Sequence, residues 1–355
     1  MDDWNSIENR RRFNVNVKFE LVEAYIKDIA YYLPKKIVTN EEIVNDFPEW
    51  SVEKITDKVG VRKRHIAAEN ETATDMAIQA AETLFSQYIV SKKDIDYILL
   101  CTQSPDYHLP PSACIVQSRL GLRKDIGALD FDLGCSGYVY GLSLAKGLVV
   151  AGIAQNVLLL TSETYNKYIH PKDKGNRTIF GDGASACVIS TEGIAKIGDF
   201  VLGTDGEGAE NLIVKTGCSR HPEKANDLIF EEKSGNPISS DHLFMDGSEI
   251  FAFTLMNVPK LLKKTIAKNN LTNDDVGLYV LHQANKYMLD YLKKKTKIEN
   301  KKFYYCLENF GNTVSSSIPI ALVEALKDGS ISKEKIVLLA GFGVGYSWAG
   351  TALYF

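Results

Sequence analysis

Two parts of the chain repeat each other, and this internal duplication limits the possible folds more than any other feature. Asp96–Cys101 aligns with Gly277–His282, 181 residues further along the chain. Two more matches follow in the same order, at offsets of 177 and 179 residues: Phe131–Cys135 with Glu308–Asn312, and Asn156–Leu160 with Lys335–Leu339. Because the order is kept and the offsets differ by only a few residues, we predict two similar halves related by a pseudo-twofold axis.

Apolar, strand-like runs alternate with helical patterns in both halves. The strand-like runs are Tyr97–Cys101, Val157–Thr161, Leu278–Leu281 and Ile336–Leu339. Helical patterns cover Ala73–Phe85, Gly137–Val150, Phe251–Lys268 and Ser316–Lys327. The strands are apolar throughout and do not alternate, which is typical of strands buried on both faces. We therefore predict an α/β fold with mostly parallel sheets that are covered by helices.

The duplication also suggests where the chain divides. Residues 1–18 have mixed charge and little periodicity, so we interpret them as an N-terminal extension. We expect the first half at 19–190 and the second at 236–355. Residues 191–235, polar and containing several glycines, are predicted to connect them.

Composition excludes several classes of protein. The chain has 355 residues, of which 45% are hydrophobic, and a net charge of −4, which gives no reason to expect nucleic-acid binding. No apolar run has the length of a membrane span, and the first 18 residues lack the hydrophobic core of a signal peptide. None of the six cysteines forms a C-x-x-C pair. These features predict a cytoplasmic enzyme with reduced thiols.

Three polar residues stand at equivalent points of the two halves and suggest one active site. Cys135 and Asn312 occupy matching glycine turns, and His282 ends the strand that matches the one ending at Cys101. A cysteine can act as the nucleophile, while histidine and asparagine can donate hydrogen bonds to an oxyanion or enolate. The helix after Cys135 should lower the pKa of its thiol. The other five cysteines are interpreted as inert thiols.

At these positions the chain resembles the 3-oxoacyl-acyl-carrier-protein synthase III family. The residues that carry the resemblance are Leu281–Asn285 (LHQAN), Asn309–Thr313 (NFGNT), Gly341–Trp348 (GFGVGYSW), Gly60–Ala67 (GVRKRHIA) and Phe180–Ala184 (FGDGA). The resemblance extends from about Val22 to Phe355. It implies the duplicated thiolase-like fold with αβαβα layers, a homodimer, and Cys135, His282 and Asn312 as the catalytic residues.

The resemblance also implies a reaction in two halves. Cys135 takes an acyl group from acyl-CoA, and a malonyl group on acyl carrier protein then loses carbon dioxide and condenses with it. The implied oxyanion hole consists of the backbone N–H groups of Cys135 and Val344. No metal or redox cofactor is required. The implied substrate-binding residues are Leu109, Asn285, Gly247, Lys58, Arg62 and Lys286.

Some residues depart from the family pattern and leave alternatives open. Tyr287 and Lys58 stand where many members have arginine, which affects how CoA and the carrier protein bind. The lysine-rich stretch 286–302 fits either a docking site for an acidic carrier protein or an ordinary solvated helix face. An acyltransferase that uses a sugar, amine or hydroxyl acceptor is a second hypothesis. A scaffold without activity is a third.

Overall fold

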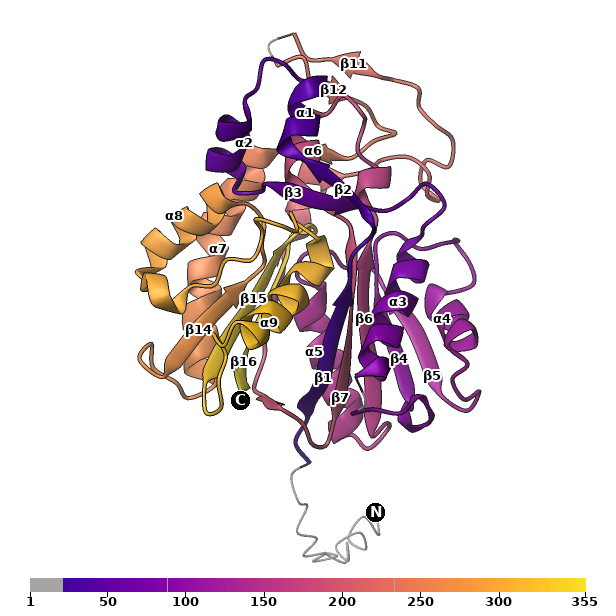
Figure 1. The fold of residues 1–355 in the computed structure, drawn as a ribbon, viewed down its shortest axis with the longest axis vertical. Coiled ribbons are helices and arrows are strands. Elements are labelled where there is room, and N and C mark those ends of the chain that lie inside the picture. Colours follow the sequence, from indigo (N-terminus) through magenta and orange to yellow (C-terminus); the bar gives the residue numbers. More distant parts are fainter. Residues whose placement is uncertain (1–21, 88, 233) are drawn as a thin grey trace, which may run out of the picture.

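The computed structural model describes residues 22–87, 89–232 and 234–355 (Figure 1). The predicted N-terminal extension, 1–18, lies outside the described residues. The helices are α1 (Asn40–Asp46), α2 (Val52–Val59), α3 (Ala73–Ser86), α4 (Ser112–Leu120), α5 (Gly137–Val150), α6 (Lys174–Ile179), α7 (Gly247–Lys268), α8 (Lys286–Thr296) and α9 (Ser317–Lys327). No described helix is both long enough and apolar enough to cross a membrane.

One large sheet of ten strands dominates the structure. Its strands follow the order β14-β15-β16-β8-β1-β7-β6-β4-β5, and β9 pairs with β16. They are β1 (Tyr25–Tyr32), β4 (Tyr97–Cys101), β5 (Gly127–Phe131), β6 (Asn156–Glu163), β7 (Gly183–Ser190), β8 (Ala195–Ile197), β9 (Val201–Thr204), β14 (Val276–Leu281), β15 (Ile336–Gly343) and β16 (Ser347–Tyr354). Short pairs lie outside it: β2 (Lys36–Thr39) with β3 (Lys63–Ile66), β10 (Leu212–Ile213) with β13 (Phe244–Met245), and β11 (Ile229–Phe230) with β12 (Pro237–Ile238).

The prediction of mostly parallel sheets is wrong. Only the pairs β4–β5, β4–β6 and β14–β15 are parallel, and the other pairs of the large sheet are antiparallel. The apolar runs indicate burial on both faces of the sheet, but they do not indicate the direction of a strand. Strand β7, for example, is antiparallel to both of its neighbours, yet every one of its residues is buried.

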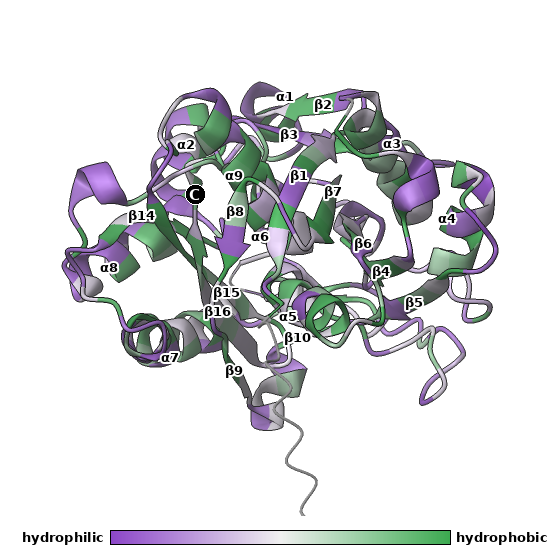
Figure 2. Cartoon of the chain, turned by 90° about the horizontal axis from the view of Figure 1, so that it is seen from below, coloured by the Kyte–Doolittle hydropathy of each residue, from purple (hydrophilic) through white to green (hydrophobic). Residues whose placement is uncertain are grey.

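The helices divide the structure into the predicted αβαβα layers. Helices α3 and α4 cover the outer face of the strands around β1, β7 and β4, while α7 covers β15 and β16 and packs against α8. Helix α5 contacts β4, β6 and β7 on one side and β15 and β16 on the other, and α9 contacts both β1 and β14. Figure 2 shows α5 and α9 between the two groups of strands, with the more hydrophilic α8 at the outside. The central helix layer therefore belongs to both halves.

The internal duplication is confirmed in the order of the elements. All eight predicted strands and helices are present, and their ends differ from the prediction by at most four residues. The parallel pairing of Tyr97 with Gly127 has its counterpart in a bridge between Tyr279 and Phe303. Cys135 consequently precedes α5 as Asn312 precedes α9. This equivalence brings the two loops to the middle of the molecule.

The predicted connecting segment, 191–235, contributes to the sheet as well as joining the halves. Its strand β8 pairs with β1 and β16, and β9 extends the sheet beside β16. The exposed pair β11–β12 and much irregular chain follow. The division into halves at residues 190 and 236 stays a prediction.

Candidate active site

Cys135 lies in a buried turn at the start of α5. A hydrogen bond of 2.8 Å from the Gly137 N–H to the Gly134 carbonyl closes the turn, and Cys135 is only 5% exposed. Neither glycine has a positive φ, so close packing explains their presence. A Cβ on Gly134 would lie 2.5 Å from Val344 Cγ1, and one on Gly137 would collide with the sulfur of Cys101.

The hairpin of β15 and β16 packs closely against Cys135. A Cβ on Gly343 would lie 2.7 Å from Cys135 Cβ and 2.8 Å from its Sγ. The Ser136 hydroxyl lies 2.7 Å from the hydroxyl of Ser347, which fixes the hairpin to the start of α5. The backbone N–H of Val344, at the tip of this hairpin, acts on the Cys135 thiol and lowers its pKa. Two N–H groups, those of Val344 and of Cys135 itself, thus lie close enough to the sulfur to influence its pKa.

Burial decides the protonation of this thiol. It raises the pKa of Cys135 to about 12, against the lowering effect of the two backbone N–H groups. The predicted lowering of the Cys135 pKa is therefore wrong for the free protein. The helix amides do act in the predicted direction, but desolvation of the charged form is the larger effect. Cys135 therefore carries a protonated thiol in the free protein.

His282 follows β14 and is held in place through both its backbone and its ring. Its N–H donates to the Ala340 carbonyl at 2.8 Å, and its Nδ1 lies 2.7 Å from the Ser317 hydroxyl. Burial lowers the pKa of His282 to about 3, although the Val314 backbone acts in the opposite direction. The imidazole is therefore neutral near pH 7, which suits a hydrogen-bond donor better than a general acid.

Asn312 is placed by the backbone on both of its sides. Gly311 before it has a φ of 70°, in the left-handed region that favours glycine. The Asn312 N–H donates to Ile179 at 2.8 Å, and its Oδ1 accepts the Val314 N–H at 2.9 Å. With Oδ1 occupied in this way, the side-chain NH₂ group is available to donate to a substrate.

Val314 links Asn312 and His282. Its N–H binds the Asn312 side chain, and its backbone also contacts the His282 ring. Val314 has a φ of 54°, an unusual and strained conformation for a β-branched residue. The sequence contains no signal for this role, because only the path of the backbone makes Val314 important.

The predicted substrate-binding residues occupy several places. Lys58 lies in the last turn of α2, and Arg62 forms an exposed ion pair of 2.6 Å with Glu308. Lys286 pairs with Asp290 at 2.5 Å and lines a cavity of about 270 Å³ near Gly60. Asn285 caps α8 by accepting the Met288 N–H at 2.8 Å. Gly247 is the first residue of α7, and Leu109 is 81% exposed.

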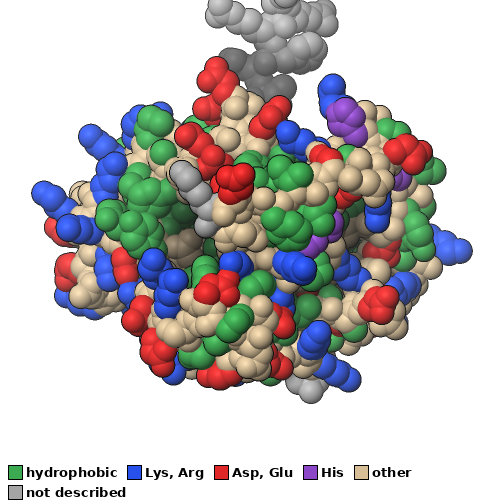
Figure 3. Space-filling model, turned by 90° about the horizontal axis from the view of Figure 1, so that it is seen from above, with side chains coloured by type: hydrophobic (Ala, Val, Ile, Leu, Met, Phe, Trp, Pro, Cys, Tyr) green, Lys and Arg blue, Asp and Glu red, His purple; other side chains and the backbone are tan. Residues whose placement is uncertain are grey.

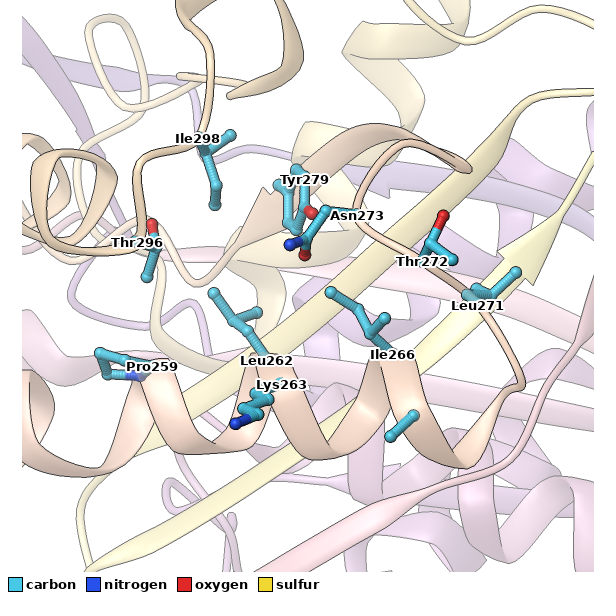
Figure 4. Close-up of a pocket in the computed structure, with 11 residues that line it drawn as sticks. Pro259, Leu262, Lys263, Ile266, Leu271, Thr272, Asn273, Tyr279, Thr296 and Ile298 are labelled. Atoms are coloured by element: carbon cyan, nitrogen blue, oxygen red, sulfur yellow. The ribbon is translucent and has the colours of Figure 1, made fainter.

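A larger groove lies away from these residues. It measures about 490 Å³ and lies between α7, β14 and the end of α8 (Figure 4). Its lining includes Leu262, Ile266 and Tyr279 but none of the predicted site residues. Within the described ranges, no group of three or more His, Cys, Asp or Glu residues could hold a metal ion.

Comparison with known proteins agrees with this geometry. Residues 129–206 match the family model described as 3-oxoacyl-[acyl-carrier-protein] synthase III, and residues 266–355 match the model of its C-terminal part. The chain is 35% identical over 339 residues to the beta-ketoacyl-[acyl-carrier-protein] synthase III of Caldanaerobacter subterraneus subsp. tengcongensis, which covers 94% of this chain and 98% of that protein. This chain belongs to the synthase III family.

Solved structures of synthase III enzymes have the same fold. A crystal structure of a 3-oxoacyl-(acyl-carrier-protein) synthase III at 50% identity superimposes with a TM-score of 0.92, covering 94% of this chain and all of the other. The synthase from Burkholderia xenovorans, 35% identical, gives a TM-score of 0.85 with 94% of each chain covered. The thiolase-like fold and an acyl-transferring condensing activity are therefore established for this synthase III.

Proposed function

We propose that this synthase III starts acyl-chain synthesis by loading an acyl group from acyl-CoA onto Cys135 and condensing it with malonyl-acyl carrier protein. The observation that carries the proposal is the position of the Cys135 sulfur, within reach of two backbone N–H groups and closed in by Gly343. A sulfur in that position can form a thioester whose carbonyl oxygen enters an oxyanion hole.

In the first half-reaction, the sulfur of Cys135 attacks the thioester carbonyl of acyl-CoA. The N–H groups of Cys135 and Val344 stabilise the negative charge on the tetrahedral oxygen. When the intermediate collapses, the carbon–sulfur bond to CoA breaks, and CoA leaves as a thiol that carries the proton lost by Cys135. Because the resting thiol is protonated, proton loss and bond formation are coupled.

In the second half-reaction, the malonyl thioester loses carbon dioxide and its carbonyl becomes an enolate. His282 and Asn312 donate hydrogen bonds to the enolate oxygen. The enolate carbon then attacks the acyl group on Cys135, and collapse of that intermediate releases the 3-oxoacyl thioester and leaves the sulfur as a thiolate. This thiolate takes up a proton from water, which restores the resting thiol. A neutral imidazole fits the enolate step, since it can donate a hydrogen bond without transferring its proton.

A test separates the two half-reactions. Replacing either donor, in His282→Ala or Asn312→Ala, should leave acylation of Cys135 measurable and reduce malonyl decarboxylation about 100- to 1,000-fold, the usual effect of removing one such donor. Undiminished condensation in both variants would contradict the proposal. Loss of acylation alone would favour an acyltransferase that uses another acceptor.

We further propose that the carrier protein docks on the lysine-rich stretch 286–302. Figure 3 shows basic side chains on the left of the upper face, the side on which α8 lies in Figure 1. Asp290 and Glu299 form ion pairs with Lys286, Lys293 and Lys301, whereas Lys294, Lys295 and Lys297 are exposed and form no ion pair with any described residue. These free charges suit an acidic partner.

A homodimer and a cytoplasmic location complete the proposal. Strand β5 ends the large sheet with one unpaired edge, and its Leu129 is 36% exposed. Tyr107 and Leu109, on the loop between β4 and α4, are also exposed, and a second copy of the chain would cover such apolar side chains. All six cysteines are free thiols, as is usual in the cytoplasm.

A further inference from the structure

Glu163, at the end of β6, is a fully buried carboxyl group for which the proposed mechanism has no role. Its Oε2 accepts the Gln103 N–H at 3.0 Å and lies 3.3 Å from the Ser104 hydroxyl. Its Oε1 lies 3.0 Å from the Ser315 hydroxyl. In the part of the chain that the structure describes, Glu163 has no ion pair with a basic side chain. A buried carboxylate without a cation is very costly, which favours the neutral acid.

The neighbouring hydrogen bonds show which oxygen carries the proton. The Gln103 N–H can only donate, so Oε2 must accept. Ser104 already accepts the Thr164 N–H at 3.2 Å, and its own hydrogen is free for Oε2. The proton of a neutral Glu163 therefore belongs on Oε1, where it points to Ser315.

From Ser315 the hydrogen bonds continue in one direction. Ser315 adjoins Cys101, because its hydroxyl opposes the rise in the pKa of the Cys101 thiol, and that thiol donates to the Leu133 carbonyl at 2.9 Å. A Cβ on Gly137 would collide with the Cys101 sulfur and lie 3.4 Å from Leu133 and 3.5 Å from Ser315. These three residues therefore converge at the first residue of α5, two positions after the nucleophile.

We propose that Glu163 is a positioning residue, a neutral carboxylic acid that joins the loop of Asn312 to the turn of Cys135. In this series of hydrogen bonds each group donates a hydrogen bond to the next: Glu163 to Ser315, Ser315 to Cys101, and Cys101 to Leu133. Ser315 lies three residues after Asn312, and Leu133 lies two before Cys135. This inference rests on the proposed function, because these hydrogen bonds would fix the distance between the nucleophile, Cys135, and the enolate donor Asn312.

A neutral Glu163 also avoids repulsion with the negative charges that develop during the reaction. The titratable groups that face Glu163 are Cys101 on β4, Asp132 after β5, Cys135 before α5, and Tyr165 and Tyr168 near the end of β6. None of them is basic. A negative charge on Glu163 would therefore oppose both the developing thiolate and the enolate. Burial raises the pKa of Glu163 well above its usual value, which keeps the carboxyl neutral.

The test compares Glu163→Gln, Glu163→Ala and Ser315→Ala in the full-length protein. A glutamine can accept from Gln103 through its oxygen and donate to Ser315 through its NH₂ group, so Glu163→Gln should keep both half-reactions within about threefold. Ser315→Ala should lower kcat for condensation about tenfold, the usual order for one broken buried hydrogen bond, while KM for acyl-CoA changes little. Glu163→Ala should lose at least as much.

A second measurement does not depend on activity. The infrared difference spectrum between wild type and Glu163→Gln at pH 7 should contain the C=O band of a protonated carboxylic acid. A carboxylate band instead, or a loss of activity in Glu163→Gln as large as in Glu163→Ala, would overturn the inference. Failure of the wild type to condense would instead count against the proposed function, and the infrared result would still decide whether Glu163 is neutral.

Discussion

The close approach of Gly343 to Cys135 leads to a sharp prediction for Gly343→Ala. The added methyl would lie 2.7 Å from Cys135 Cβ and 2.8 Å from Sγ. Non-bonded carbon atoms prefer separations of about 3.5–4.0 Å, so the overlap is about 1 Å. The strand has little freedom to move away, because Gly343 pairs with Ser347 in β16 and β15 is also paired with β14.

The size of the effect follows from this overlap. Overpacking of a buried site usually costs about 1–3 kcal/mol in the free energy of unfolding. The same clash falls on the sulfur that we propose bonds to the acyl carbon. If the transition state bears the whole cost, acylation should slow by about 5- to 150-fold.

Gly147→Ala in α5 is the matched control. A Cβ there meets no atom within 4 Å, and alanine in place of a mid-helix glycine should stabilise the protein by about 0.5–1 kcal/mol. The assay combines urea unfolding with the rate of acyl transfer from acyl-CoA, followed by mass spectrometry. Wild-type acylation and stability in Gly343→Ala would refute the packing of β15 against the nucleophile.

Two further predictions concern charge. The double variant Lys294→Glu, Lys295→Glu should raise KM for malonyl-acyl carrier protein and make this KM less sensitive to salt, while acylation by acyl-CoA is unchanged. The control is the double variant Lys263→Glu, Lys264→Glu on α7. If KM changes no more in the α8 variant than in this control, α8 is an ordinary solvated face. Because burial lowers the pKa of His282 to about 3, the unfolded state binds more protons between about pH 6.5 and 3, so stability should fall as pH falls through this range. In urea unfolding, His282→Gln should lose that part of the pH dependence, and an unchanged dependence would contradict a buried neutral imidazole.

Much of the fold could be predicted because the duplication and the apolar runs are written in the sequence itself. The strand Tyr97–Cys101 and the helix Gly137–Val150 were predicted with the observed ends. Strand direction could not be read from such runs. A strand such as β7 is covered by helices on both faces whichever way it runs, and its apolar sequence therefore looks the same.

Residue types and the equivalent turns of the two halves were enough to predict which residues form the candidate site, but not their protonation or their supporting contacts. Cys135, His282 and Asn312 could be selected because each follows an apolar strand or a glycine turn. The protonation of Cys135 could not be predicted, because burial raises the pKa of its thiol and two backbone N–H groups lower it, and the sequence does not show which effect is larger. Val314 and Glu163 were missed because their importance comes from a strained φ and from buried hydrogen bonds, which leave no motif.

Mass spectrometry of the intact protein after incubation with a panel of acyl-CoA thioesters shows directly whether Cys135 carries the acyl group. We expect that the wild-type protein gains the mass of one acyl group, that peptide mapping places it on Cys135, and that Cys135→Ala gains none. Addition of malonyl-acyl carrier protein should then remove the group and yield a 3-oxoacyl thioester. An acyl group that persists on Cys135→Ala, or that maps to another cysteine, would contradict the account.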